Sequence, residues 1–168
     1  EIPFDVIERD IKLPINRNKI ITVPGVRRCG KSTLMEIAIN GLVREGVSPR
    51  NILWLGFDDE RLKNMSSDDL DDVIVSYMEM FPDIPIKDVY MFFDEIQLIK
   101  DWEYFVLRVY KSYCKNIYVC GSNATMLSTE LSSALRGYPL EYETYPLSFN
   151  EYCRFKGIAT NSYLEQDR

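Results

Sequence analysis

Eight residues of the sequence have the types and spacing of a phosphate-binding loop. They run G-x-x-x-x-G-K-S from Gly25 to Ser32. The two glycines, Gly25 and Gly30, let the backbone turn so that successive N–H groups point inward, where they can bind phosphate oxygens. Lys31 can reach the β- and γ-phosphates of a nucleotide, and the hydroxyl of Ser32 can bind Mg²⁺. The pattern therefore predicts a site for a nucleoside triphosphate and its metal ion.

The residues on either side of this loop predict the elements that hold it. A β-branched apolar run, 20–23, reads as a buried strand, and residues 33–43 carry apolar side chains at helical spacing. This order directs the positive N-terminus of a helix at phosphate. Further nucleotide contacts are expected from Arg28, Cys29 and Thr33. For Arg28 the alternative is an ordinary solvated arginine.

A second group of chemistry-bearing residues is the acidic pair Asp94-Glu95, which ends the apolar run 89–93. A carboxylate in this Walker B position can hold Mg²⁺ through its water shell, so Asp94 is the second expected metal residue beside Ser32. Glu95 can orient or deprotonate an attacking water. Adjacent strand residues face opposite ways, but the chain turns at a strand's end, so both can border one crevice.

A third polar group follows the apolar run 117–120. Asn123, or Ser122 beside it, would point from a neighbouring strand toward the γ-phosphate, as the sensor residue does in P-loop ATPases that insert a strand between the two Walker strands. The alternative is a simple turn, since Gly-Ser-Asn is ordinary turn chemistry. Gln97 either contacts the same region or caps the next helix.

These groups need a framework of alternating strands and helices. Buried strands are predicted at 20–23, 52–55, 89–93 and 117–120, and a partly exposed strand at 138–145. Helices are predicted from 33 to about 46, from Ser66 or Ser67 to 80, from the cap Asp101 to 113, over 124–135, and from the cap Ser148 to 156. A short helix is expected near 3–10. Apolar strands alternating with helices predict a parallel sheet covered on both faces, an α/β fold that binds ligands at the strands' carboxyl ends.

Composition limits the remaining chemistry. The 168 residues suit one domain, with 1–18 as a lead-in, and contain no histidine, which excludes His-based acid–base catalysis and Cys/His zinc sites. The four cysteines show no C-x-x-C spacing and suit reduced thiols in a cytoplasmic protein. Only Cys29, within the loop, has a position that could favour oxidation. We expect no membrane span and no secretory segment, and the first residue, Glu1, suggests a piece of a longer protein.

Together the motifs resemble a prokaryotic AAA-type P-loop ATPase family whose members usually carry a nuclease-like C-terminal domain. The matching segments are 24–34, 92–97, 101–102, 121–123, 131–137 and 145–152. The resemblance implies a three-layer P-loop NTPase fold of AAA/STAND-like type, with a mainly parallel sheet in the AAA/ASCE strand order. It also implies that 1–168 is an ATPase core in which 146–168 begins a truncated lid or linker. The catalytic residues implied are Lys31, Glu95 and Asn123.

One departure concerns an arginine. The family usually places it directly after the glycine that corresponds to Gly137, where this chain has Tyr138. If that arginine acts on a neighbouring subunit's nucleotide in an oligomer, this chain either lacks it or uses Arg136 instead.

The predicted function is Mg²⁺-dependent ATP binding and slow hydrolysis to ADP and phosphate, coupled to movement of an attached effector domain or protein partner. The choice of ATP over GTP rests on the resemblance and on the missing N/T-K-x-D guanine motif. The alternatives are a nucleotide-gated protein-binding switch with negligible hydrolysis and, less consistent with Asp94-Glu95, a small-molecule kinase. The net charge of −6 argues against a broad nucleic-acid surface and leaves a local basic patch open.

Overall fold

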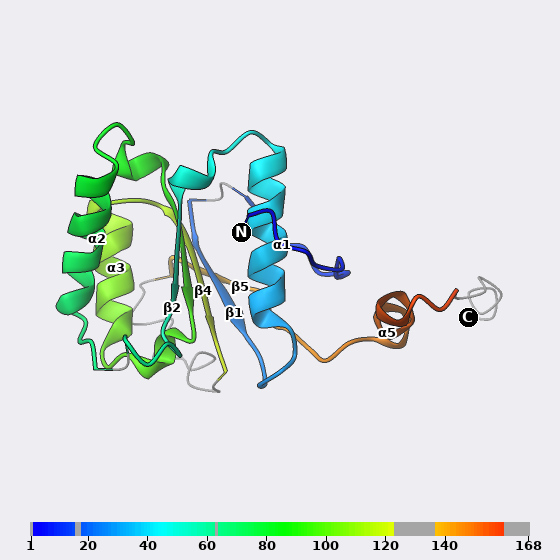
Figure 1. Ribbon diagram of the computed structural model, residues 1–168. Coiled ribbons are helices and arrows are strands. Elements are labelled where there is room, and N and C mark those ends of the chain that lie inside the picture. The colour runs from blue at the N-terminus through cyan, green and yellow to red at the C-terminus, as the bar shows by residue number, and fades with distance from the viewer. Residues whose placement is uncertain (1, 16–17, 63, 123–136, 160–168) are drawn as a thin grey trace.

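A parallel five-stranded sheet is the central layer of the protein (Figure 1). The computed structural model describes residues 2–15, 18–62, 64–122 and 137–159. The strand order is β2-β3-β4-β1-β5, and every pair of neighbours is parallel. The strands are β1 (Ile20–Pro24), β2 (Ile52–Gly56), β3 (Tyr90–Asp94), β4 (Asn116–Gly121) and β5 (Pro139–Glu141). The predicted α/β fold is confirmed, and β4 is inserted between β1 and β3, as the AAA/ASCE order requires.

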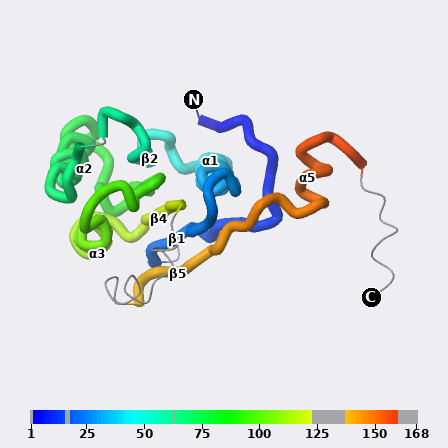
Figure 2. The backbone as a smooth tube through the Cα atoms, turned by 90° about the horizontal axis from the view of Figure 1, so that it is seen from below, coloured from blue at the N-terminus to red at the C-terminus, as the bar shows by residue number. Residues whose placement is uncertain are grey.

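Helices cover both faces of the sheet. Figure 1 shows α1 (Lys31–Arg44) on one face and α2 (Asp69–Met80) with α3 (Trp102–Ser112) on the other. Three short 3₁₀ turns, Pro49–Asn51, Ile86–Asp88 and Ile96–Leu98, flank β2 and β3. A further helix, α5 (Phe149–Lys156), lies beyond α1, away from the sheet (Figures 1 and 2).

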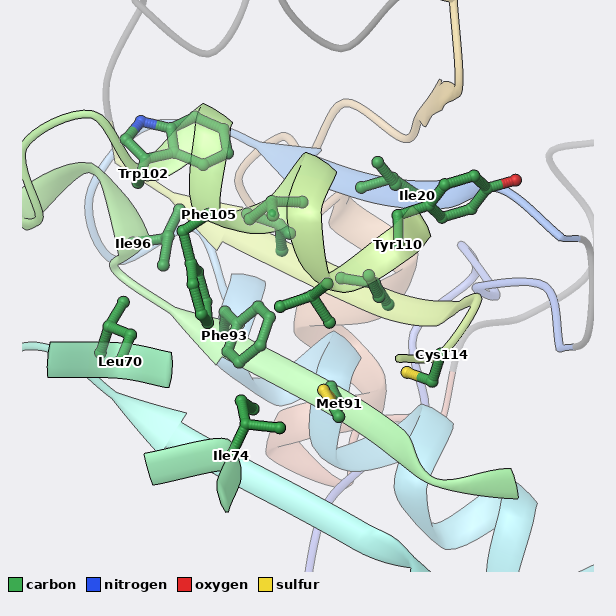
Figure 3. Packing of buried hydrophobic residues seen from close by; sticks show 14 of the residues in the cluster. Ile20, Leu70, Ile74, Met91, Phe93, Ile96, Trp102, Phe105, Tyr110 and Cys114 are labelled. Carbon is green, nitrogen blue, oxygen red and sulfur yellow. The ribbon is translucent and has the colours of Figure 1, made fainter. Parts of the chain in front are cut away.

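Each face of the sheet has its own apolar core, because successive strand residues point to opposite sides. In β3, Met91 and Phe93 pack on the α2/α3 side, where Figure 3 shows them with residues of α2 and α3. Tyr90 and Phe92 pack on the α1 side. All five residues of β1 and of β3 are buried, which explains why these strands are continuous apolar runs rather than alternating ones.

The short helix expected near 3–10 is wrong, since residues 2–15 contain no helix or strand. Side chains hold this lead-in segment along the body instead. The amide of Asn40 on α1 binds both the N–H and the carbonyl of Phe4, at 2.7 and 2.8 Å. The hydroxyl of Tyr118 donates to the carbonyl of Pro14 at 2.8 Å. These bonds satisfy backbone groups that a helix would have paired internally.

Two helix starts differ from the predictions. The helix expected from Ser66 or Ser67 begins at Asp69, because Ser66 and Asp69 form a turn in which the carboxylate accepts from both the N–H and the hydroxyl of Ser66. Asp101 precedes α3 as predicted but makes no side-chain cap, since its backbone is left-handed at φ 58°. The helix predicted over 124–135 lies outside the described residues.

The start of α5 agrees with the prediction that Ser148 caps this helix. Ser148 accepts from the N–H of Glu151, and the Glu151 carboxylate accepts from the N–H of Ser148, a reciprocal capping box. The strand expected over 138–145 is shorter than predicted. Beyond β5 the N–H of Tyr142 donates to the carbonyl of Thr22 at 2.8 Å, and Thr144 forms an isolated bridge with Gly25.

Acid should weaken this fold through Glu151. Burial disfavours its charge, but the side chain of Arg9 and the N–H groups of Ser148 and Asp10 bind the carboxylate and lower its pKa from 4.5 to about 2. A lowered folded-state pKa gives stability that is complete above the unfolded value and is lost as the pH falls through the folded one. In urea melts, the free energy of unfolding should fall by about 2–3 kcal/mol more for the native chain than for Glu151→Gln between pH 5 and pH 2. Equal losses in the two proteins would contradict this assignment.

Candidate functional site

The phosphate-binding loop joins β1 to α1, and both of its glycines are sterically required. A Cβ on Gly25 would lie 2.7 Å from the carbonyl oxygen of Thr144 and 2.8 Å from the sulfur of Cys29. Gly30 precedes the first residue of α1 with a left-handed backbone at φ 87°, and a Cβ there would lie 2.7 Å from the guanidinium of Arg9. The loop is therefore packed tightly against two other parts of the chain, Thr144 and Arg9.

Lys31 closes the loop. Its side chain is almost fully buried, and its ammonium donates to the carbonyls of Gly25 and Val26 at 3.0 and 2.8 Å. The ammonium is thereby held across the phosphate-binding loop. The N–H groups of this loop and of the first turn of α1 are the expected donors to phosphate. Arg28 also has a left-handed backbone, at φ 64°, and its side chain is exposed.

Arg9 is a contact of this loop that the sequence did not suggest. Its guanidinium donates to the carbonyl of Cys29 at 2.8 Å and pairs with Glu151 on α5 at 2.6 Å. The partners Arg9 and Glu151 are 142 residues apart. In a single sequence no spacing or periodicity marks such a pair.

The acidic pair lies at the end of β3. Asp94 is buried, and its Oδ1 accepts from the thiol of Cys120 at the end of β4. Burial, followed by the negative charge of Asp94, raises the pKa of Cys120, so this thiol stays protonated and acts as a donor. At Glu95 the backbone is left-handed, with φ 51°, and the strand ends in a 3₁₀ turn. This turn is the change of direction that the sequence required for both carboxylates to face one crevice.

Two neighbours hold the carboxylate of Glu95. The hydroxyl of Ser122 and the side-chain amide of Gln97 both donate to Oε2, the former at 2.6 Å. Gln97 also donates to Ser122 at 3.3 Å, so the open question about Gln97 is answered: it contacts the crevice. Burial opposes charge on Glu95, yet these hydrogen bonds and the charges of Lys31 and Arg27 together lower its pKa.

The sheet brings the loop and the acidic pair to the same edge, because the loop follows β1 and the pair ends β3, and both strands are parallel to β4. Lys31 and Arg27 both act on Glu95. Asp94 in turn raises the pKa of Glu36, after burial as the larger cause. Glu36 lies four residues after Ser32, on the same face of α1. Ser32, in the first turn of α1, and Asp94, at the end of β3, therefore both lie at the carboxyl-terminal edge of the sheet.

The residues of the crevice fit Mg²⁺, which takes oxygen ligands, keeps several waters and needs only one or two protein ligands beside the phosphates. The hydroxyl of Ser32 and the carboxylate of Asp94 are ligands of that type. Within the described parts of the chain there is no cluster of three or more Asp, Glu, Cys or His residues that would form an all-protein metal cage. Asn123, the expected sensor, lies outside the described residues, as does Arg136.

A cavity of about 230 Å³ adjoins the loop on the side of α5. On one side it is lined by residues of the loop and of the first turn of α1 that are expected to contact the nucleotide. On the other side it is lined by apolar side chains of the C-terminal segment. Its lining is Arg9, Arg28, Cys29, Gly30, Thr33, Leu147 and Phe155.

The comparison with known families agrees with this geometry. A family model described as an AAA domain matches residues 17–153. The chain belongs to this AAA family. The match covers both the loop of Lys31 and the acidic pair of β3, so the predicted kinship with AAA-type P-loop ATPases is confirmed and nucleotide binding is the function shared at family level. Of the helices in the described ranges, none is long and apolar enough to cross a membrane.

Two curated relatives extend beyond this AAA domain. An uncharacterized protein of Methanocaldococcus jannaschii is 36% identical over 154 residues, which cover 91% of this chain and 32% of that protein. An uncharacterized protein of Haemophilus influenzae is 35% identical over 145 residues, which cover 86% of this chain and 36% of that protein. The chain thus spans about a third of the length of the curated relatives it matches.

Removing the Ser122 hydroxyl should change the titration of Glu95. Since hydrogen bonds from Ser122 and Gln97 favour the carboxylate, Ser122→Ala should raise the pKa of Glu95 above its native value. A ¹³C NMR titration of the side-chain carboxyl carbons, with the Glu95 signal assigned by its loss in Glu95→Gln, measures both values. An unchanged midpoint in Ser122→Ala would contradict the observed contact.

Proposed function

We propose that this AAA domain binds Mg-ATP, hydrolyses it slowly to ADP and phosphate, and transmits the change to an attached effector domain or a protein partner. The observation that carries the proposal is the edge of the sheet, where the phosphate loop after β1 meets the acidic pair at the end of β3 and the charge of Lys31 acts on Glu95. A phosphate loop and a Walker B pair that face each other are the parts that nucleotide hydrolysis needs.

Each residue has a proposed role. Lys31 and the N–H groups of the loop stabilise negative charge on the transferred phosphoryl group. Ser32 and Asp94 hold the metal, which when bound neutralises charge on the phosphates. Glu95 orients the attacking water through Oε1, since the hydrogen bonds from Ser122 and Gln97 both go to Oε2. Asn123 remains the proposed γ-phosphate sensor.

Contacts to the rest of the nucleotide are proposed at the cavity beside the loop. Thr33 and Arg28 offer polar groups there, and Leu147 and Phe155 offer an apolar surface. A mixed lining of this kind suits a base and ribose attached to phosphates held in the loop. ATP is proposed rather than GTP because of the family resemblance and because the sequence lacks the N/T-K-x-D guanine motif.

A nucleotide-gated switch with negligible hydrolysis is the second candidate, and Tyr138 favours it. This residue occupies the place of the arginine usual in the resembled family, and its ring packs against Tyr110 with centroids 4.7 Å apart. A tyrosine side chain carries no positive charge, so Tyr138 cannot replace that arginine at a neighbouring subunit's nucleotide, and Arg136 is the alternative source of the charge. Single-turnover hydrolysis with enzyme in excess, repeated over a range of protein concentrations, separates the two: phosphate release supports the ATPase, and its absence at every concentration supports the switch.

Lys31→Ala should abolish nucleotide binding. The variant loses the cation at the mouth of the loop, and we expect the affinity for Mg-ATP to fall by about 100-fold or more. Isothermal titration calorimetry measures the loss, with circular dichroism as a check of folding. Lys111→Ala, at an exposed lysine on α3, is the matched control and should bind as the native chain does.

Glu95→Gln should separate binding from turnover. The amide keeps the shape of the side chain but cannot accept a proton, so the affinity for Mg-ATP should change little while phosphate release falls by about 10²-fold or more. Glu79→Gln, at an exposed position of α2, provides the control. Native rates in Glu95→Gln would remove Glu95 from its proposed role.

A further inference from the structure

We propose that Arg9 is a positioning residue for the phosphate loop and that Glu151 makes this positioning depend on the docking of α5. The proposal rests on the nucleotide binding proposed above and assigns it a regulatory link. It concerns two residues that lie in the lead-in and in α5, outside the Walker motifs.

The side chain of Arg9 is buried and bonded to three parts of the chain. The residue is 4% exposed, and its guanidinium has bonds on all three nitrogens. Nε donates to Glu151 Oε1 at 2.6 Å, Nη1 to the carbonyl of Cys29 at 2.8 Å, and Nη2 to the carbonyl of Tyr145 at 3.0 Å and to Glu151 Oε2 at 3.3 Å. The planar fork of an arginine can serve these separate acceptors together, whereas the single ammonium of a lysine cannot.

The bond to the Cys29 carbonyl fixes a phosphate donor. In a trans peptide the C=O and the next N–H point in opposite directions. Because Arg9 holds the carbonyl of Cys29 on its own side, the N–H of Gly30 points to the other side. This peptide immediately precedes Lys31, the first residue of α1, where unpaired N–H groups form an anion site. Arg9 therefore preorganises the loop for phosphate without itself contacting phosphate.

Glu151 connects this support to α5. Its carboxylate accepts from Arg9, from the N–H of Asp10 at 3.0 Å and from the N–H of Ser148 at 2.9 Å. One buried group thus joins the lead-in, the first turn of α5 and the guanidinium that supports the loop. Figure 2 shows the lead-in running between α1 and α5.

Because Arg9 and Glu151 are buried together, the position of Arg9 depends on α5 staying docked. If α5 moves away, Arg9 loses its counter-charge, and an unpaired buried guanidinium is strongly unfavourable. Arg9 would then move toward water and release the Cys29 carbonyl, which loosens the loop. By linkage, a nucleotide that stabilises the loop must stabilise the docked α5 by the same factor.

A second arginine provides a matched control. Arg154 on α5 also reaches the lead-in, donating to the carbonyl of Glu8 and to Asp10 Oδ1, both at 2.9 Å. It is exposed, and within the described residues its side-chain hydrogen bonds go to the lead-in rather than to the phosphate loop. If α5 docking supported the loop by a route other than Arg9, Arg154 would matter as much as Arg9. If the Cys29 carbonyl is the decisive contact, only Arg9 matters.

The test compares Arg9→Lys with Arg154→Lys in the full chain. Arg9→Lys keeps the charge opposite Glu151 and loses the fork, so the affinity for Mg-ADP in calorimetry should fall by about tenfold or more. Arg154→Lys should change it by less than about twofold. Without any nucleotide, amide hydrogen exchange at Gly30 and Lys31 should be faster in Arg9→Lys than in the native chain and unchanged in Arg154→Lys.

A third variant tests the link itself. Glu151→Gln keeps an oxygen for the N–H groups of Ser148 and Asp10 but removes the charge that holds Arg9, so it should also weaken Mg-ADP binding. In the native chain Mg-ADP should slow amide exchange in α5, and this slowing should be lost in Arg9→Lys. Glu151→Gln alone, read in the same assays, decides the question if Arg9→Lys does not fold.

The outcomes separate this inference from the proposed function. A native chain that binds no Mg-nucleotide refutes the proposed function, and the exchange comparison without nucleotide then still decides whether Arg9 orders the loop. A native chain that binds, with equal affinity and equal loop exchange in Arg9→Lys, overturns the inference. A loss of affinity in Arg154→Lys that persists in the Arg9→Lys background overturns it as well, because α5 docking would then act on the loop by a route other than Arg9.

Discussion

The pairing of β4 with both β1 and β3 is the constraint on which the rest of the site depends. All three strands are parallel, so their carboxyl ends meet at one edge of the sheet. That edge carries the phosphate loop after β1, the acidic pair at the end of β3, and Ser122 after β4. The register that aligns Phe93 with Val119, and Val119 with Thr22, keeps these strand ends level. Residues far apart in the sequence thereby act on one another across a single crevice.

Charge balance in that crevice follows from the same arrangement. Asp94 and Glu95 place two carboxylates beside each other in a partly buried site, which is costly unless each is satisfied. The protonated thiol of Cys120 donates to Asp94, while Ser122, Gln97 and the charge of Lys31 stabilise Glu95. β4 and the residue that follows it therefore supply a donor to each member of the acidic pair, a reason for the strand's central place that goes beyond sheet pairing.

Local chemistry made much of the fold and of the site predictable. Glycines at a tight loop, apolar runs of strand length and the Ser148–Glu151 capping box each act over a few residues, and the structure contains all of them. Three features were not predictable, two because of distant contacts and one because of a local backbone conformation. Asn40 holds the lead-in where a helix was expected, the left-handed backbone of Asp101 prevents its cap, and Arg9 meets Glu151 only through the tertiary fold.

The most direct test of the account is a crystal structure of the chain with Mg²⁺ and a non-hydrolysable ATP analogue. The account predicts that the β- and γ-phosphates lie in the loop against the N–H of Gly30 and the ammonium of Lys31. It also predicts that Mg²⁺ contacts the Ser32 hydroxyl and reaches Asp94 directly or through one water. Phosphates bound outside the loop, or a metal remote from Asp94, would contradict it.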